Sequence, residues 1–150
     1  MEKKQRTLNN KGFSLIELIV VIAIMAILVG VLAPNVMRYV RQSRVSADTQ
    51  LADTIRTAVV TALADPVVVD APASGTIDLT SSTAFTSTPG FGAAIATNLG
   101  YSSIADMQAA SGGIASQAKS MTPTAINVKI DGSSMVKVTI SDGTNKVEVP

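Results

Sequence analysis

Phe13 and Glu17 are the residues of this chain whose types and spacing could do chemistry. Glu17 is the only charged residue in an apolar run of 21 residues that ends at Ala33. A charge at the centre of a bilayer costs roughly 2.5–3.5 kcal/mol, so this carboxylate is expected to have a partner. Residues four apart share one face of a helix. If the chain were cut between Gly12 and Phe13, the new α-amino group would lie on that face and could pair with Glu17.

The partner of Glu17 has two possible sources. The amine could belong to the same chain, or to an adjacent copy that is shifted along the helix axis. A third interpretation needs no amine, because a carboxylate near the membrane surface could reach the water of the headgroup layer.

An apolar helix over residues 13–34 must position this carboxylate. At 1.5 Å per residue, the 21 apolar residues make a helix of about 32 Å, long enough to span a membrane. Residues 1–12 carry a net charge of +3, which favours a cytoplasmic N-terminus. An ordinary signal peptide is the alternative, but it would be cut after the apolar run, where "GVLAPN" offers a poor site.

The N-terminal third of the chain resembles the class III signal of type IV pilins and of the type II secretion pseudopilins. The resemblance covers about residues 3–45. The residues that carry it are a basic leader ending in Lys11-Gly12, then "FSLIE" from Phe13 to Glu17, then an apolar span that reaches Pro34.

This resemblance implies a processing and assembly route. A membrane prepilin peptidase would cut after Gly12 and methylate the new N-terminal residue, Phe13. Glu17 would then pair with the N-terminus of a neighbouring subunit while copies polymerise into a helical filament with the help of the pilus assembly machinery.

Pro34 builds a weak point into the helix, because it has no N–H to donate to the carbonyl of Gly30. The resemblance implies that the segment from Ala26 to Pro34 unwinds as subunits leave the bilayer and pack, and Gly30 suits such melting. A gentle kink is the alternative, since proline is common in membrane helices.

Three arginines recur at every third position just after the apolar run: Arg38, Arg41 and Arg44. They are expected to contact lipid phosphates before extraction and acidic groups of neighbouring subunits afterwards. Asp48 and Asp53 follow on the same helix. A solvated helix face is the alternative interpretation.

Beyond Pro34 the pattern becomes amphipathic and predicts that the helix continues to about Ala64, where Pro66 ends it. The apolar positions of this second half recur at steps of three, four or seven residues: Val36, Val40, Ala47, Leu51, Ile55, Val59 and Ala62. Residues 65–92 are predicted to be a variable loop with a short strand near Thr76 to Leu79. The Ala-rich residues 93–120 are predicted to hold one or two short helices.

Residues 125–149 alternate apolar and polar side chains in three runs separated by Asp-Gly pairs, which predicts a three-stranded antiparallel meander. The apolar positions are Ile126, Val128, Ile130, Val136, Val138, Ile140, Val147 and Val149. One face of such a sheet needs a cover, and the helix over residues 35–64 can provide it. The expected fold is therefore α+β: a leader (1–12), a membrane-spanning helix (13–34) and a globular domain (35–150) in which an amphipathic helix packs on a small C-terminal sheet.

The composition excludes several functional classes. The chain has no His and no Cys, which removes the usual zinc ligands and the His-dependent nucleophile arrangements. We expect no enzymatic activity, no cofactor and no specific nucleic-acid binding. The pairs Asp131-Gly132 and Asp142-Gly143 are compatible with a calcium site, but no cluster of oxygen ligands accompanies them, so hairpin turns are favoured and no metal site is predicted.

The function expected from sequence is a structural subunit of a type IV pilus, anchored in the cytoplasmic membrane with lipid around its helix before export to the cell surface. A pseudopilin of a type II secretion piston is an alternative within the same superfamily. A monomeric membrane protein with an extracytoplasmic binding domain is an alternative from another class, and it would keep the N-terminus that precedes Phe13.

Overall fold

The computed structural model describes residues 13–132 and 135–150. The chain divides into two compact units, Met1–Val40 and Arg41–Pro150. The long helix α1, Leu15–Ala64, contributes to both units. The helix predicted from Phe13 starts two residues later and ends at Ala64 as predicted, just before Asp65-Pro66. The leader, including Gly12, lies outside the described residues.

Within the first unit, α1 exposes its apolar side chains. All described residues of this unit are exposed, including every Ile, Leu and Val from Leu15 to Val40. The helix is continuous through Pro34. An apolar surface of this extent is not stable in water, so lipid or other protein must cover it.

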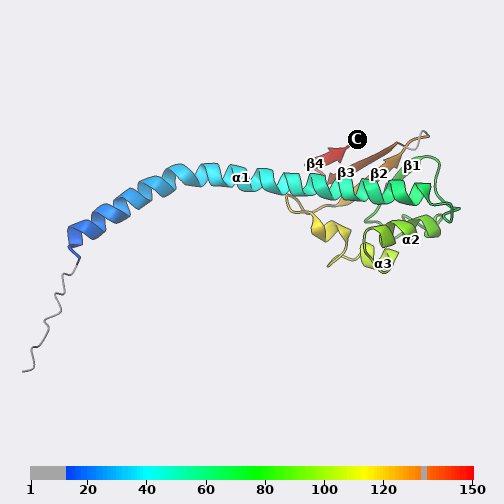
Figure 1. The fold of residues 1–150 in the computed structure, drawn as a ribbon, viewed down its shortest axis with the longest axis horizontal. Helices are drawn as coiled ribbons and strands as arrows, with labels where there is room; N and C mark the ends of the chain where they lie inside the picture. Colours follow the sequence, from blue (N-terminus) through cyan, green and yellow to red (C-terminus); the bar gives the residue numbers. More distant parts are fainter. Residues whose placement is uncertain (1–12, 133–134) are drawn as a thin grey trace, which may run out of the picture. The chain divides into compact units, whose positions relative to one another are not determined.

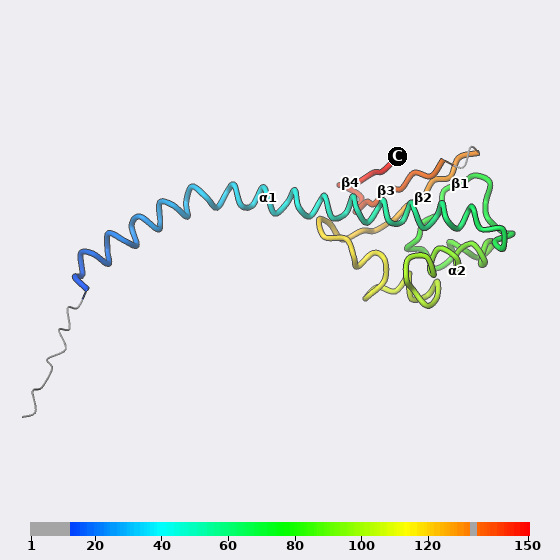
Figure 2. The backbone as a smooth tube through the Cα atoms, in the orientation of Figure 1, coloured from blue at the N-terminus to red at the C-terminus, as the bar shows by residue number. Residues whose placement is uncertain are grey.

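The second unit contains a four-stranded antiparallel sheet in the order β1-β2-β3-β4 (Figure 1). The strands are β1 (Gly75–Asp78), β2 (Ala125–Ile130), β3 (Val136–Ser141) and β4 (Lys146–Val149). Strands β2, β3 and β4 are the predicted meander. The short strand expected near Thr76 is β1, and it adds a fourth strand because it pairs with β2. Figure 2 shows the chain running through β3 into β4, the edge strand next to the C-terminus.

The register of the sheet places its branched apolar residues on one face. Ile77 pairs with Val128, Val128 with Val138, and Val138 with Val149, so one row crosses all four strands. These side chains meet α1 in the hydrophobic core, where Ile55 and Val59 are fully buried. The helix-on-sheet α+β fold is therefore confirmed.

Only some of the apolar residues in the amphipathic pattern of α1 are buried in this core. Leu51, Ile55, Val59 and Ala62 are buried as expected, whereas Val36 and Val40 remain 54% and 42% exposed. The burial begins at Asp48 in α1. Of the apolar positions before that residue, Val36 and Val40 are exposed and Ala47 is half-buried.

Three short helices complete the second unit: α2 (Pro89–Asn98), α3 (Ile104–Met107) and the 3-10 helix η1 (Ile114–Gln117). The Ala-rich region thus holds one more helical segment than expected. In addition, α2 begins inside the predicted loop. The start of α2 is capped by a residue that is distant in the sequence. The Asp70 carboxylate accepts the N–H groups of Gly90 at 2.7 Å and Phe91 at 2.8 Å.

Asp48 joins α1 to the segment before β2. It is the one buried charged residue in the described part of the chain, with 0% exposure. Its carboxylate accepts the backbone N–H groups of Lys119 at 2.6 Å and Ser120 at 3.0 Å, and the Ser120 hydroxyl as well. Asp48 is therefore satisfied within its own chain and is not part of a solvated helix face, the alternative that the sequence left open for this charged stretch.

Both Asp-Gly pairs lie in the hairpin connections that the sequence favoured. The Asp142 carboxylate accepts the N–H groups of Thr144 at 2.9 Å and Asn145 at 2.6 Å, and also the Asn145 side-chain amide. These hydrogen bonds, with the Asn145 amide first among them, lower the pKa of Asp142 below its ordinary value. Gly143 has φ +90°, a conformation that glycine adopts without strain.

Candidate processing and assembly site

The N-terminal end of α1 brings together Phe13, Ser14 and Glu17. Phe13 precedes the helix and is 94% exposed. Glu17 lies in the first turn, and its Oε2 atom accepts the backbone N–H of Ser14 at 2.8 Å. This is one half of a capping box, in which an acid at the third helical position satisfies an N–H that has no partner within the helix.

The structure therefore gives Glu17 a partner other than the amine expected from the sequence. The sequence signal was present, because Ser14 and Glu17 have the S-x-x-E spacing of a capping box just before an apolar run. A carboxylate has two oxygens and accepts several hydrogen bonds. The Ser14 N–H uses Oε2, so Oε1 can still accept an amine.

A shallow apolar groove adjoins this carboxylate. It has a volume of about 280 Å³ and is lined by Ile16, Glu17, Val20 and Val21. The lining is almost wholly hydrocarbon, so the groove suits an apolar side chain of another helix rather than a polar ligand.

Gly30 and Pro34 lie in the interior of α1, four residues apart. The proline ring removes the N–H that would otherwise bond the Gly30 carbonyl. A Cβ atom built on Gly30 meets nothing within 4 Å, so no contact within the chain requires glycine at this position.

The three predicted arginines lie on α1 and are exposed. Arg38, Arg41 and Arg44 form no hydrogen bond or ion pair with any other residue in the described ranges. The structure thus leaves their guanidinium groups available to lipid phosphates or to another protein.

Candidate metal ligands do not cluster in the described part of the chain, where no group of three or more Asp or Glu side chains is suitably placed.

The apolar part of α1 is, by length and composition, the one segment among the described helices that could cross a membrane. The length and composition of this segment suit anchoring and packing.

The comparison with known families decides what this N-terminal region is. Residues 7–33 match the prokaryotic N-terminal methylation motif. This is the class III prepilin signal, and the match supports a pilin-like or pseudopilin prepilin-type protein. Comparison with curated proteins and with solved structures gave no significant match.

The methylation motif indicates a family of structural subunits rather than enzymes. It spans the predicted cleavage position, Glu17 and the apolar run, so it contains the residues that the sequence singled out before Pro34. Such a signal implies processing by a prepilin peptidase and assembly into pilus-like filaments. Together with the exposed apolar helix, it also implies a membrane-anchored protein that is assembled at the surface.

Proposed function

We propose that this chain is a prepilin that is cleaved after Gly12, methylated at Phe13 and polymerised into a type IV pilus. Before assembly, residues 13–34 span the cytoplasmic membrane with the N-terminus on the cytoplasmic side. The observation that carries this proposal is an apolar helix, exposed throughout the first unit, that begins next to the predicted cleavage position within the methylation motif.

Polymerisation moves this helix from lipid into a bundle of identical helices. Lipid already satisfies its apolar side chains, so the hydrophobic effect contributes little to this step. Close packing and matched charges must favour the assembled state instead. The groove beside Glu17 provides a place for an apolar side chain of a neighbour.

Glu17 sets the axial position of each subunit in this scheme. Oε2 holds the Ser14 N–H of its own chain, and Oε1 accepts the α-amino group of Phe13 from an adjoining copy. A subunit at the wrong height leaves a carboxylate unpaired in an apolar surrounding, which is strongly unfavourable.

The experiment compares wild type with Glu17→Gln in cells that express a prepilin peptidase and the assembly machinery. Glutamine keeps an oxygen for the Ser14 N–H but loses the charge. We expect wild-type fibres built from this chain, whereas the variant stays in the membrane fraction. Absence of wild-type fibres would overturn the proposed function, and an unchanged fibre yield in the variant would overturn the role of the charge.

A further inference from the structure

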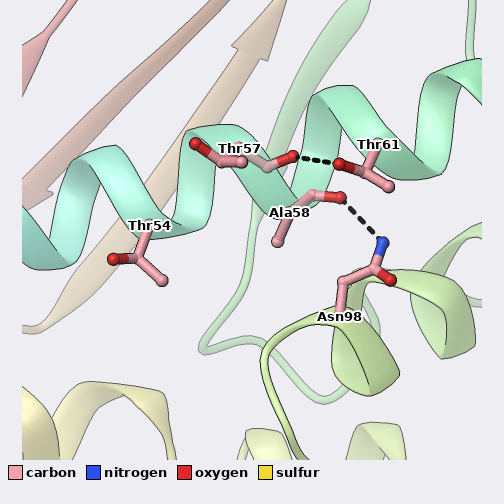
Figure 3. A pocket seen from close by; sticks show the side chains of 5 residues that line it. All are labelled: Thr54, Thr57, Ala58, Thr61 and Asn98. Atoms are coloured by element: carbon pink, nitrogen blue, oxygen red, sulfur yellow. Dashed lines mark hydrogen bonds between the residues drawn. The ribbon is translucent and has the colours of Figure 1, made fainter.

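A polar groove lies between α1 and α2 in the second unit (Figure 3). It has a volume of about 330 Å³ and is lined by Thr54, Thr57, Ala58, Thr61 and Asn98. Figure 3 shows Asn98 reaching from α2 to α1, where its Nδ2 atom donates to the Ala58 carbonyl at 3.1 Å. Neither the methylation motif nor the proposed filament assigns a role to this groove.

The groove offers mostly hydrogen-bond acceptors. Each threonine hydroxyl donates its proton to a carbonyl one turn earlier: Thr54 to Gln50, Thr57 to Asp53 and Thr61 to Thr57, at 2.8–2.9 Å. The lone pairs of these hydroxyl oxygens and the Asn98 Oδ1 atom therefore remain to accept hydrogen bonds from a ligand. Asp53 lies one turn before Thr57, with its side chain exposed and without a partner among the described residues. The groove therefore suits a cationic group rich in donors.

The same unit carries such groups on a different face of α1. Arg41 and Arg44 are exposed and have no partner in the part of the chain that the structure describes. Thr57 and Thr61 follow Arg41 by 16 and 20 residues, which places them about 160° and 200° around the helix from it. Arg41 therefore points away from the groove of its own chain.

We infer that the threonine groove of one copy binds the guanidinium of Arg41 from a second copy. This inference rests on the proposed function, because it needs copies that assemble. Arginine fits the groove because its five N–H donors lie in one plane and can reach several acceptors at once. Donor and acceptor lie on opposite faces of α1, so the contact is head-to-tail and repeats along a filament rather than closing a dimer.

The contact also sets a separation between the two copies. Along α1, Arg41 and the Thr57–Thr61 pair lie about 24 to 30 Å apart at 1.5 Å per residue. Copies that run parallel are therefore offset by about that length along the axis, so this second copy is a different neighbour from the one whose Phe13 amine pairs with Glu17, an offset of only about 6 Å. In this arrangement Arg44 of one copy lies beside Thr61 of the other.

Cysteine cross-linking in assembled fibres tests the inference, since the chain has no cysteine of its own. Two single variants, Arg44→Cys and Thr61→Cys, are co-expressed and treated with a short bifunctional maleimide, so that Arg41 and Thr57 stay in place. We expect an intermolecular product. The control pairs Arg44→Cys with Thr144→Cys, at the exposed β3–β4 turn, and should give none.

Hydroxyl removal gives a second readout. Thr57→Val with Thr61→Val should lower the fibre yield about tenfold, the scale expected for losing hydrogen bonds to a charged group. Thr97→Val is the matched control, because Thr97 makes the same bond to a carbonyl one turn earlier but does not line the groove. Its fibre yield should stay at the wild-type level.

The outcomes separate this inference from the proposed function. Suppose that wild-type fibres form but the Arg44→Cys and Thr61→Cys pair gives no cross-linked product, or that the double valine variant matches Thr97→Val in fibre yield. Either result would show that the groove contact is wrong, and the filament proposal would stand. If wild type forms no fibres, the proposed function fails, and the inference fails with it.

Discussion

The carboxylate of Glu17 accepts the backbone N–H of Ser14 at 2.8 Å, so this acid stabilises the start of the helix that carries it. Its charge is also favoured there by the positive end of the helix dipole. Both effects act within one chain and need no second copy. Glutamine can keep the hydrogen bond but not the charge, so Glu17→Gln removes the dipole interaction and any pairing with a second copy while the Ser14 N–H keeps an acceptor.

Asp48→Ala should destabilise the second unit. The substitution leaves the N–H groups of Lys119 and Ser120 without their buried acceptor, so we expect the free energy of unfolding to fall by about 3 kcal/mol. Urea unfolding of the full chain in detergent, followed by circular dichroism, measures it. Asp53→Ala is the matched control on the same helix, because its side chain is exposed, and a change as large as that of Asp48→Ala would contradict this account.

Asp70 and Gly90 should behave as a coupled pair. A Cβ atom on Gly90 would approach Asp70 Oδ1 to 2.8 Å and displace the carboxylate that caps α2. Asp70→Ala should cost about 1–2 kcal/mol of unfolding free energy. Gly90→Ala should be destabilising in wild type but nearly neutral in the Asp70→Ala background. A double-mutant cycle measures this coupling, and additive effects would show that the two residues act independently.

The pKa of Glu148 should depend mainly on Lys137. The hydrogen bond from the Lys137 side chain, with a smaller contribution from Lys146, lowers this pKa below its ordinary value of 4.5. Because the folded pKa is the lower one, the stabilisation is fully present above 4.5 and is lost as the pH falls through the folded pKa. An NMR titration should show a larger upward shift in the Glu148 pKa for Lys137→Met than for Lys146→Met. The reverse order would refute the assignment.

Gly30→Ala should hinder assembly without disturbing the membrane-anchored chain. No atom lies within 4 Å of the added Cβ, and alanine favours the helix by about 1 kcal/mol over glycine. If residues 26–34 must unwind during assembly, the fibre yield should fall while the amount of membrane-inserted protein stays the same. Ala26→Gly is the opposite change in the same segment and should not lower the yield. Equal yields for wild type and Gly30→Ala would argue against unwinding.

Local signals were enough to predict the main elements. Pro66 ends α1 where expected, and alternation around Val128, Val138 and Val147 marks the three strands of the meander. The S-x-x-E spacing of Ser14 and Glu17 also carried a signal for the helix start. Each of these features depends on residues that are close together in the sequence.

Contacts between distant residues account for what the sequence did not predict. The carboxylate that caps α2 belongs to Asp70, about 20 residues before the groups it binds. Asp48 resembles a surface acid until the Lys119–Ser120 segment covers it. The groove around Thr57 exists only because α2 lies against α1. No periodicity or short motif encodes these pairings.

The central claim is that the chain is cut before Phe13 and that its apolar helix is retained for assembly. Intact-mass analysis of protein sheared from the cell surface tests it most directly. We predict a chain that starts at Phe13, carries one added methyl group and still contains residues 13–34. A soluble product that starts after residue 33 would contradict the account, because Glu17 and the whole apolar helix would then have been discarded.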